Sequence, residues 1–190
     1  MTDKERDILL GKYLTLSEFC TCTKTYQKYA EKIAPFPKNP ESLVAIADLN
    51  TRVIDPIIDR FGREKFHLTY GFCSSDLKRY LARKDPLTGQ KNGRVTPSLD
   101  QHMAMEKNRN GKYYCDRLGA ACDFFIEDVS SNTIIDWILA QKLPFDSLYF
   151  YGEKRPLHIS HGPQQKRAIW GFTPTGQPTR QNVRHWLEKT

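Results

Sequence analysis

The chain has 190 residues, of which 39% are hydrophobic and 27% charged, so it is long enough for one globular domain with a buried core. It contains no apolar run of about 18 residues, and its charged start, MTDKERDILLGKYL, lacks the pattern of a signal peptide. We therefore expect no membrane span and a protein that is cytoplasmic, or released by lysis. The formal net charge of +7 favours an anionic partner such as nucleic acid, an acidic membrane surface or anionic cell wall.

Helices are expected in the first part of the chain. Ser17 is a plausible cap for a helix that begins within LTLSEF, and the proline-rich segment 34–42 is a connector. Apolar residues then recur at helical spacing over 43–61. Pro56 should kink this helix or shift its register, and Gly62 should end it.

Strands dominate the expectation for the second part. The alternation in KFHLTYGF (65–72) predicts a strand, and residues 84–98 have the composition of a long loop. The remaining expected elements are a strand at 122–128, a capped helix at 130–142, two strands of a hairpin at 147–152 and 156–160, and a loose surface tail from Gly162 that ends in a short helix. This order predicts an α+β fold, an antiparallel sheet with helices packed to one side, in one domain. We place the domain at 1–161 and the tail, packed on the same domain, at 162–190.

Positive charge is densest between Lys78 and Arg94, in KRYLARKDPLTGQKNGR. Such a stretch is typical either of a surface that binds nucleic acid or of a solvated loop. The sequence leaves both interpretations open.

The five cysteines are odd in number and include no Cys-x-x-Cys pair. This argues against a zinc ribbon and against a redox pair. We expect reduced and mostly buried thiols.

A carboxylate stands in an otherwise apolar run, Asp123 in GAACDFFI, and such a group is normally paired or bound to a metal. His102 precedes it and His158 follows it. Two histidines and one aspartate from separate elements suffice for a catalytic zinc site with a fourth position for water. Spacing alone is weak evidence, because any chain with five histidines offers such a trio, and His67 and His185 fit structural or surface roles.

Several segments, in order, resemble the zinc peptidases that include D-Ala-D-Ala carboxypeptidases, phage L-Ala-D-Glu endolysins and the hedgehog signalling domain. The similar segments are YLTLSEF, NPESLVAIADLNTRVIDPIIDRFG, FHLTYGFCSSDL, SLDQH, LGAACDF, LPFDSLYFY and PLHIS, which together span roughly residues 13–161. The resemblance implies a hedgehog/DD-peptidase-like fold. It also implies that His102, Asp123 and His158 bind Zn²⁺.

The sequence departs from the family pattern in its substrate-binding residues. The two ligands His102 and Asp123 stand further apart than in the family, and the inserted EKNRNGKYYCDR should form a loop beside the metal. Its Tyr113 and Tyr114 either stack on a sugar or base or pin the loop to the core. The arginine with which the family grips a substrate carboxylate corresponds here to Cys73, so Arg79 or Lys78 is the candidate substitute.

The general base is a second departure. The family often has an acidic residue three positions before its last histidine ligand, and that position is Arg155, which would stabilise an oxyanion or hold a substrate carboxylate. Glu153 is the nearest carboxylate, as a base or as a solvated turn residue. His161 is a further candidate as base, oxyanion partner or alternative ligand. Strand alternation places His158 and His161 on opposite faces, so only one of them should point at the metal.

The sequence is therefore consistent with three functions. The first is a zinc-dependent hydrolase that cleaves an amide, most simply in peptidoglycan peptides. The second is a non-catalytic binding module that keeps the zinc and the scaffold. The third is a family member redirected to nucleic acid, supported by the net charge and by the basic and aromatic insertion. The sequence does not predict the oligomeric state.

Overall fold

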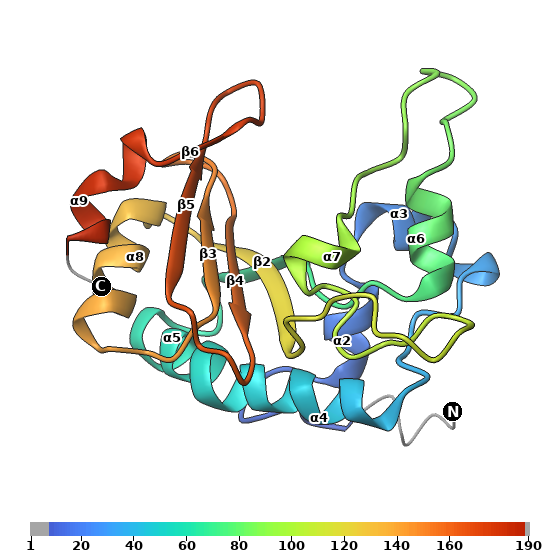
Figure 1. The fold of residues 1–190 in the computed structure, drawn as a ribbon, viewed down its shortest axis with the longest axis horizontal. Helices are drawn as coiled ribbons and strands as arrows, with labels where there is room; N and C mark the ends of the chain where they lie inside the picture. The colour runs from blue at the N-terminus through green and yellow to red at the C-terminus, as the bar shows by residue number, and fades with distance from the viewer. Residues whose placement is uncertain (1–7, 189–190) are drawn as a thin grey trace.

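The computed structural model describes residues 8–188 and has a six-stranded sheet as its centre (Figure 1). The strands are β1 (Phe66–Tyr70), β2 (Ala120–Ile126), β3 (Ser147–Phe150), β4 (Leu157–His161), β5 (Ala168–Phe172) and β6 (Pro178–Thr179), in the spatial order β1-β2-β4-β3-β5-β6. Neighbouring strands are antiparallel except β3 and β5, which are parallel. The predicted α+β fold is confirmed, and the predicted antiparallel sheet is correct for every pair of strands except β3 and β5.

Helices are short and surround the sheet on several sides. They are α2 (Leu16–Thr21), α3 (Lys24–Lys28), η1 (Ala30–Lys32), α4 (Pro40–Leu49), η2 (Asn50–Ile54), α5 (Asp55–Phe61), α6 (Ser75–Leu81), α7 (Pro97–Asp100), α8 (Ser131–Ala140), η3 (Gln181–Val183) and α9 (Arg184–Leu187). Within residues 8–188, no helix is both long enough and apolar enough to span a bilayer.

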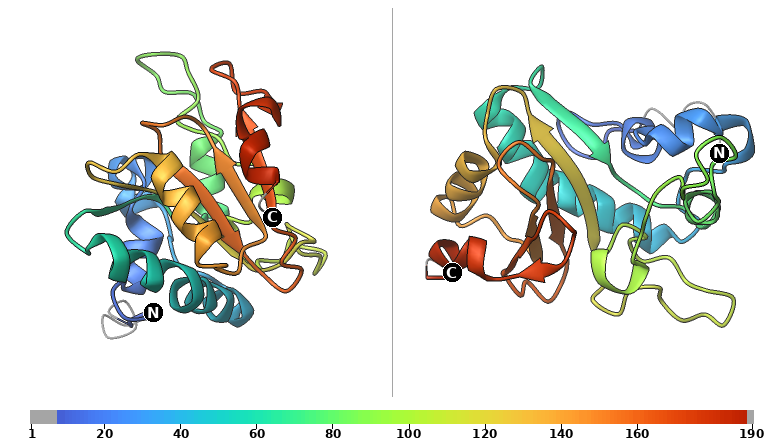
Figure 2. Two further views of the ribbon diagram at one scale, coloured as in Figure 1. Left: turned by 90° about the vertical axis from the view of Figure 1, so that its left-hand side faces the viewer. Right: turned by 90° about the horizontal axis from the view of Figure 1, so that it is seen from above.

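One face of the sheet is packed against helices, and the other carries polar and aromatic side chains. Along β2, Ala120, Cys122 and Phe124 are buried in the main core, together with apolar residues of α4, α5 and α8. Asp123 alternates to the opposite face, as the two-residue period of a strand requires. Figure 2 shows α4 and α5 running along one side of the sheet. The prediction of helices on one side of the sheet therefore holds for α4, α5 and α8.

Helices α3 and α6 do not cover the sheet. They enclose a second, smaller core that contains Ile33, Leu77, Tyr80 and Leu81. Figure 1 shows this pair beside the sheet, on the side away from α8. The region extends into the predicted loop at 84–98, which is irregular except for one bridge between Lys84 and Lys91 and the start of α7.

The predicted helix over 43–61 is present, and its register shifts as expected. A π-helical turn, η2, joins α4 to α5, and the backbone N–H of Asp55 bonds to the carbonyl of Asn50. Pro56 follows at once, and a proline cannot donate to the carbonyl four residues earlier, so the wider turn accommodates it. Gly62, with φ of 96°, ends α5 as predicted.

The cap of the first helix is Thr15, and the prediction of Ser17 is wrong. The Thr15 hydroxyl accepts the backbone N–H of Glu18 at 3.1 Å, and the Glu18 carboxylate accepts the backbone N–H of Thr15 at 2.8 Å. This reciprocal pair is a capping box, which satisfies two backbone donors at once.

The C-terminal tail is part of the sheet, so the prediction of a loose surface tail is also wrong. Ile169 of β5 is buried, and β5 pairs with β3. Trp186 of α9 is fully buried, packs edge-on against Phe150 with ring centroids 5.1 Å apart, and donates its indole N–H to Asp136 at 3.1 Å. The tail thus completes the core.

Candidate metal centre

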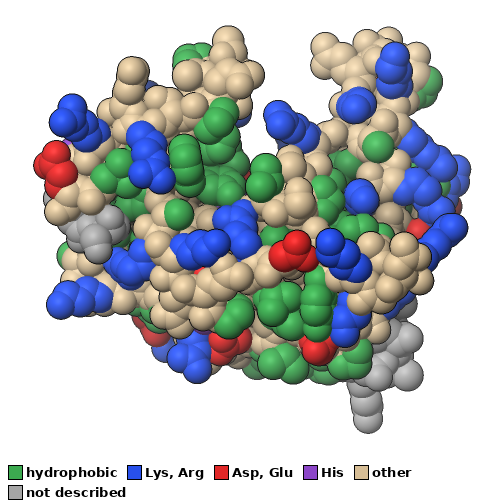
Figure 3. Space-filling view, viewed as in Figure 1, with side chains coloured by type: hydrophobic (Ala, Val, Ile, Leu, Met, Phe, Trp, Pro, Cys, Tyr) green, Lys and Arg blue, Asp and Glu red, His purple; other side chains and the backbone are tan. Residues whose placement is uncertain are grey.

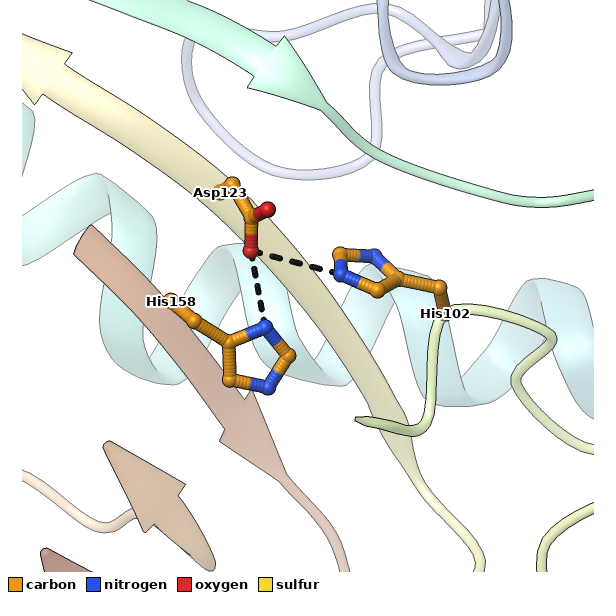
Figure 4. A group of neighbouring side chains, drawn as sticks. All are labelled: His102, Asp123 and His158. Atoms are coloured by element: carbon orange, nitrogen blue, oxygen red, sulfur yellow. Dashed lines mark hydrogen bonds and ion pairs between the residues drawn. The ribbon is translucent and has the colours of Figure 1, made fainter. Parts of the chain in front are cut away.

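Two neighbouring strands and one loop bring His102, Asp123 and His158 together (Figure 4). Asp123 of β2 and His158 of β4 are direct partners in the antiparallel register. Side chains of such partners emerge on the same face with their Cβ atoms about 5 Å apart. His102 enters from the loop that follows α7 and points at the same carboxylate.

The three side chains present one ligand atom each, all within 4.8 Å of one another. Asp123 Oδ1 lies 2.7 Å from His158 Nδ1 and 3.3 Å from His102 Nε2. Zinc holds histidine nitrogen and carboxylate oxygen at about 2.0–2.2 Å, which puts adjacent ligand atoms a little over 3 Å apart. The donor set and its spacing therefore fit a divalent cation with little movement.

The orientation of His102 is fixed by a backbone carbonyl. His102 Nδ1 lies 2.9 Å from the carbonyl oxygen of Gly71, and the backbone N–H of Cys73 bonds to the carbonyl of His102 at 2.8 Å. Nδ1 therefore donates to this carbonyl, which leaves Nε2 as the nitrogen that faces Asp123. Gly71 is required here, because a Cβ at this position would overlap the carbonyl oxygen of Phe19.

A tyrosine covers the second histidine. The rings of Tyr149 and His158 are stacked, with centroids 4.4 Å apart at an angle of 13°. The Tyr149 hydroxyl donates to the carbonyl of Leu99 at 3.0 Å and accepts from Arg117 at 3.2 Å. Leu99 lies in α7, three residues before His102. Tyr149 therefore links the segment that carries His102 to β3, the strand beside His158. The sequence analysis missed this contact, which only the fold creates.

Burial and charge set the protonation of the three groups. Burial alone would raise the pKa of Asp123, but His102 and His158 hold it well below its usual range. Burial also lowers the pKa of His158, whereas Asp123 raises the pKa of His102 in spite of burial. An ionised aspartate and a neutral imidazole are the forms that bind a metal.

Asp100 is a further carboxylate at this site that the sequence analysis missed. Its Oδ1 accepts the backbone N–H of His102 at 3.3 Å, and its Oδ2 accepts the backbone N–H of Thr96 at 2.5 Å. Its charge also acts to raise the pKa of both His102 and His158. Its position two residues before His102, in SLDQH, was the available signal.

The predicted catalytic residues lie away from the three ligands. His161 is on the opposite face of β4, as alternation predicted, and its Nε2 lies 3.1 Å from Asp48 of α4. Glu153 is exposed and its carboxylate accepts from the side chain of Asn132 at 3.0 Å, at the start of α8. Arg155 is exposed in the same turn.

The predicted substrate-binding residues also have other partners. Arg79 forms an ion pair with Asp76 at 2.6 Å on the surface of α6. The Tyr113 hydroxyl lies 3.0 Å from the carboxylate of Glu41, so it pins the inserted loop to α4. Tyr114 lies under the Lys78 ammonium, 4.7 Å from its ring centroid. The contact of Tyr113 with Glu41 agrees with the interpretation that it pins the loop.

Comparison of the chain with protein-family models, with curated proteins and with solved structures finds no match.

Proposed function

We propose that the chain is a zinc-dependent hydrolase whose metal is held by His102, Asp123 and His158. The observation that carries this proposal is the convergence of three donor atoms on one point, with His102 oriented by the Gly71 carbonyl. Three protein ligands of nitrogen and oxygen leave a fourth zinc position open. Zinc bound there would lower the pKa of a water molecule and polarise a substrate carbonyl.

An amide in a peptidoglycan peptide is the substrate we propose, with a hedgehog/DD-peptidase-like fold. This part rests on the ordered sequence resemblance over residues 13–161 and on the basic surface, which suits an anionic cell wall. The open face of the sheet beside Tyr149 and His158 is where the peptide would lie.

A general base must lie near the ligands to accept a proton from the attacking water. Asp100 contacts the His102 backbone, whereas Glu153 is hydrogen-bonded to Asn132 on the core side of the sheet. We therefore favour Asp100 over Glu153 for the proton transfer. The role of Arg155 as an oxyanion partner requires its exposed turn to move.

The test is the zinc content of protein purified without a histidine tag, measured by elemental analysis. About one zinc per chain is expected, and His102→Ala and Asp123→Ala should both lose it. His161→Ala and His67→Ala are the matched controls and should keep it. No zinc in the wild-type protein, or zinc lost only in His161→Ala, contradicts the proposed site. Release of a D-amino acid or a shortened peptide from muropeptides then tests the reaction.

A non-catalytic zinc module is the second candidate, and the position of Glu153 favours it. A site that holds zinc but lacks a base would bind without turnover. Zinc at about one per chain in both the wild type and Asp100→Asn, with no cleavage of any muropeptide by the wild type, would decide for this alternative.

A further inference from the structure

Most of the net charge of the protein is concentrated in one region, which we call the cationic lobe and define as residues 23–33 and 74–96. It contains nine lysines and arginines against three acidic residues, so it accounts for a charge of +6 out of the total of +7. The two segments are one structural unit, because Thr25 donates to the carbonyl of Asn92 at 3.2 Å and the rings of Tyr29 and Tyr80 pack at 5.0 Å. A charge this asymmetric predicts an anionic partner.

Most of these cations are available to a partner. Two of them are paired, Lys28 with Asp85 and Arg79 with Asp76. Six others are exposed and, within residues 8–188, form no ion pair: Lys24, Lys32, Arg83, Lys84, Lys91 and Arg94. Figure 3 shows blue side chains gathered over this side of the molecule with few red ones among them.

Across a notch from the lobe stands a row of aromatic side chains on the open face of the sheet, which we call the aromatic wall: Tyr149, Tyr151, Trp170 and Phe172. The rings of Tyr151 and Phe172 are 4.9 Å apart, and the Arg180 guanidinium lies 4.4 Å from the centroid of Trp170. Figure 3 shows the notch between the loop that follows α6 and the C-terminal strands.

We infer that the cationic lobe and the aromatic wall together bind single-stranded nucleic acid. Lysines and arginines along one side would follow the phosphates, while rings on the other side would stack on the bases. A duplex hides its base faces, so it would use the lobe but not the wall. The inference goes beyond the proposed zinc chemistry and does not depend on it, because the three ligands belong to neither surface and the zinc site shares only Tyr149 with the wall.

An anionic membrane is the competing partner. Leu87, at the tip of the loop in the lobe, is 92% exposed, with Lys84 three residues before it and Lys91 four residues after it. Burying one leucine contributes only about 2 kcal/mol, and a membrane would leave the wall unused. The charge and the rings together therefore favour the nucleic acid.

The test is the binding of a fluorescent oligothymidylate of about 20 nucleotides to the full chain, followed by anisotropy with EDTA present. EDTA removes any zinc, so failure of the zinc proposal leaves this result unaffected. With about six phosphates contacted, affinity should fall by roughly 300-fold between about 50 and 200 mM salt.

Two charge-reversal variants with equal change in net charge locate the surface. Lys91→Glu with Arg94→Glu should lower the affinity tenfold or more and make the slope of log K against log salt shallower by about 1.4. The control, Lys65→Glu with Lys154→Glu, lies outside the lobe and should change the affinity less than about threefold. An equal loss in both variants overturns the inference, because net charge would then explain the binding.

Tyr151→Ala tests the wall without changing the charge, and it also serves if the lobe variant fails to fold. It should weaken oligothymidylate binding about tenfold. No binding at about 50 mM salt, tighter binding of a blunt duplex of equal length, or displacement of the oligonucleotide by phosphatidylglycerol vesicles would each overturn the inference.

Discussion

The ring of Tyr149 lies parallel to the ring of His158, and its hydroxyl reaches the carbonyl of Leu99, three residues before His102. One side chain thus contacts both halves of the candidate metal centre. The effect of this contact on zinc binding can therefore be measured.

Removal of the Tyr149 side chain should weaken zinc binding. Tyr149→Ala loses both the stack on His158 and the bond to α7, and outer contacts of this kind typically change metal affinity about 10–100-fold. Tyr149→Phe keeps the ring and loses only the hydroxyl bonds, so its effect should be smaller. Competition with a chromophoric chelator measures both, and Tyr113→Phe is the control. Equal affinity in all four proteins would contradict a positioning role.

Gly71→Ala should destabilise the protein by about 2–3 kcal/mol, because the new methyl group would overlap the carbonyl of Phe19 in a packed region. The free energy of unfolding in urea measures this effect. Gly89→Ala is the comparison, since open space surrounds that position and only its φ of 68° opposes a side chain. A smaller loss at Gly71 than at Gly89 would show that the backbone shifts freely around the His102 anchor.

The thiols of Cys20 and Cys22 should react slowly in the folded protein. Burial raises the pKa of Cys22 to about 12 and that of Cys20 well above its ordinary value of 9.0. A thiol with a pKa of 12 is ionised in only about one molecule in 10⁵ at pH 7. Ellman's reagent should therefore label Cys22 quickly only after denaturation, and Cys22→Ser is the control that identifies its contribution.

The same shift predicts how stability depends on pH. Folded Cys22 stays protonated, while the thiol of the unfolded chain ionises near pH 9. The contribution of Cys22 to the free energy of unfolding is therefore fully present below pH 9 and is lost as the pH rises towards 12. Urea denaturation at pH 8 and pH 10.5 should show a smaller loss of stability in Cys22→Ser than in the wild type. An equal loss would assign the alkaline instability to other groups.

Trp186→Ala should destabilise the fold by about 3–5 kcal/mol, although Trp186 lies four residues from the end of the chain. The substitution leaves a cavity against Phe150 and removes the bond to Asp136. Thermal unfolding measures the loss, and Trp170→Ala, on the half-exposed face of β5, is the control. A loss of stability below about 1 kcal/mol would show instead that the tail contributes little to the core.

The sequence was sufficient for the elements whose signals are local. The helix over 43–61, the strand that contains Asp123 and the opposite faces of His158 and His161 follow from period and alternation, and all are present. The tail was misjudged because β5 gains its burial from pairing with β3, a contact that no local pattern reports. Tyr149 was missed for the same reason, since it reaches His158 from a neighbouring strand. Asp100 is different, because its place two residues before His102 was a local signal.

The three candidate ligands differ in how their positions are specified. Register between β2 and β4 sets Asp123 and His158 opposite each other, and a carbonyl from a third segment holds His102. Neither constraint involves the length of the chain between His102 and Asp123. The exposed tip of that segment, residues 109–112, is therefore the place where residues can be inserted without moving a ligand, and an engineered loop or label placed at Asn110 should leave the centre intact.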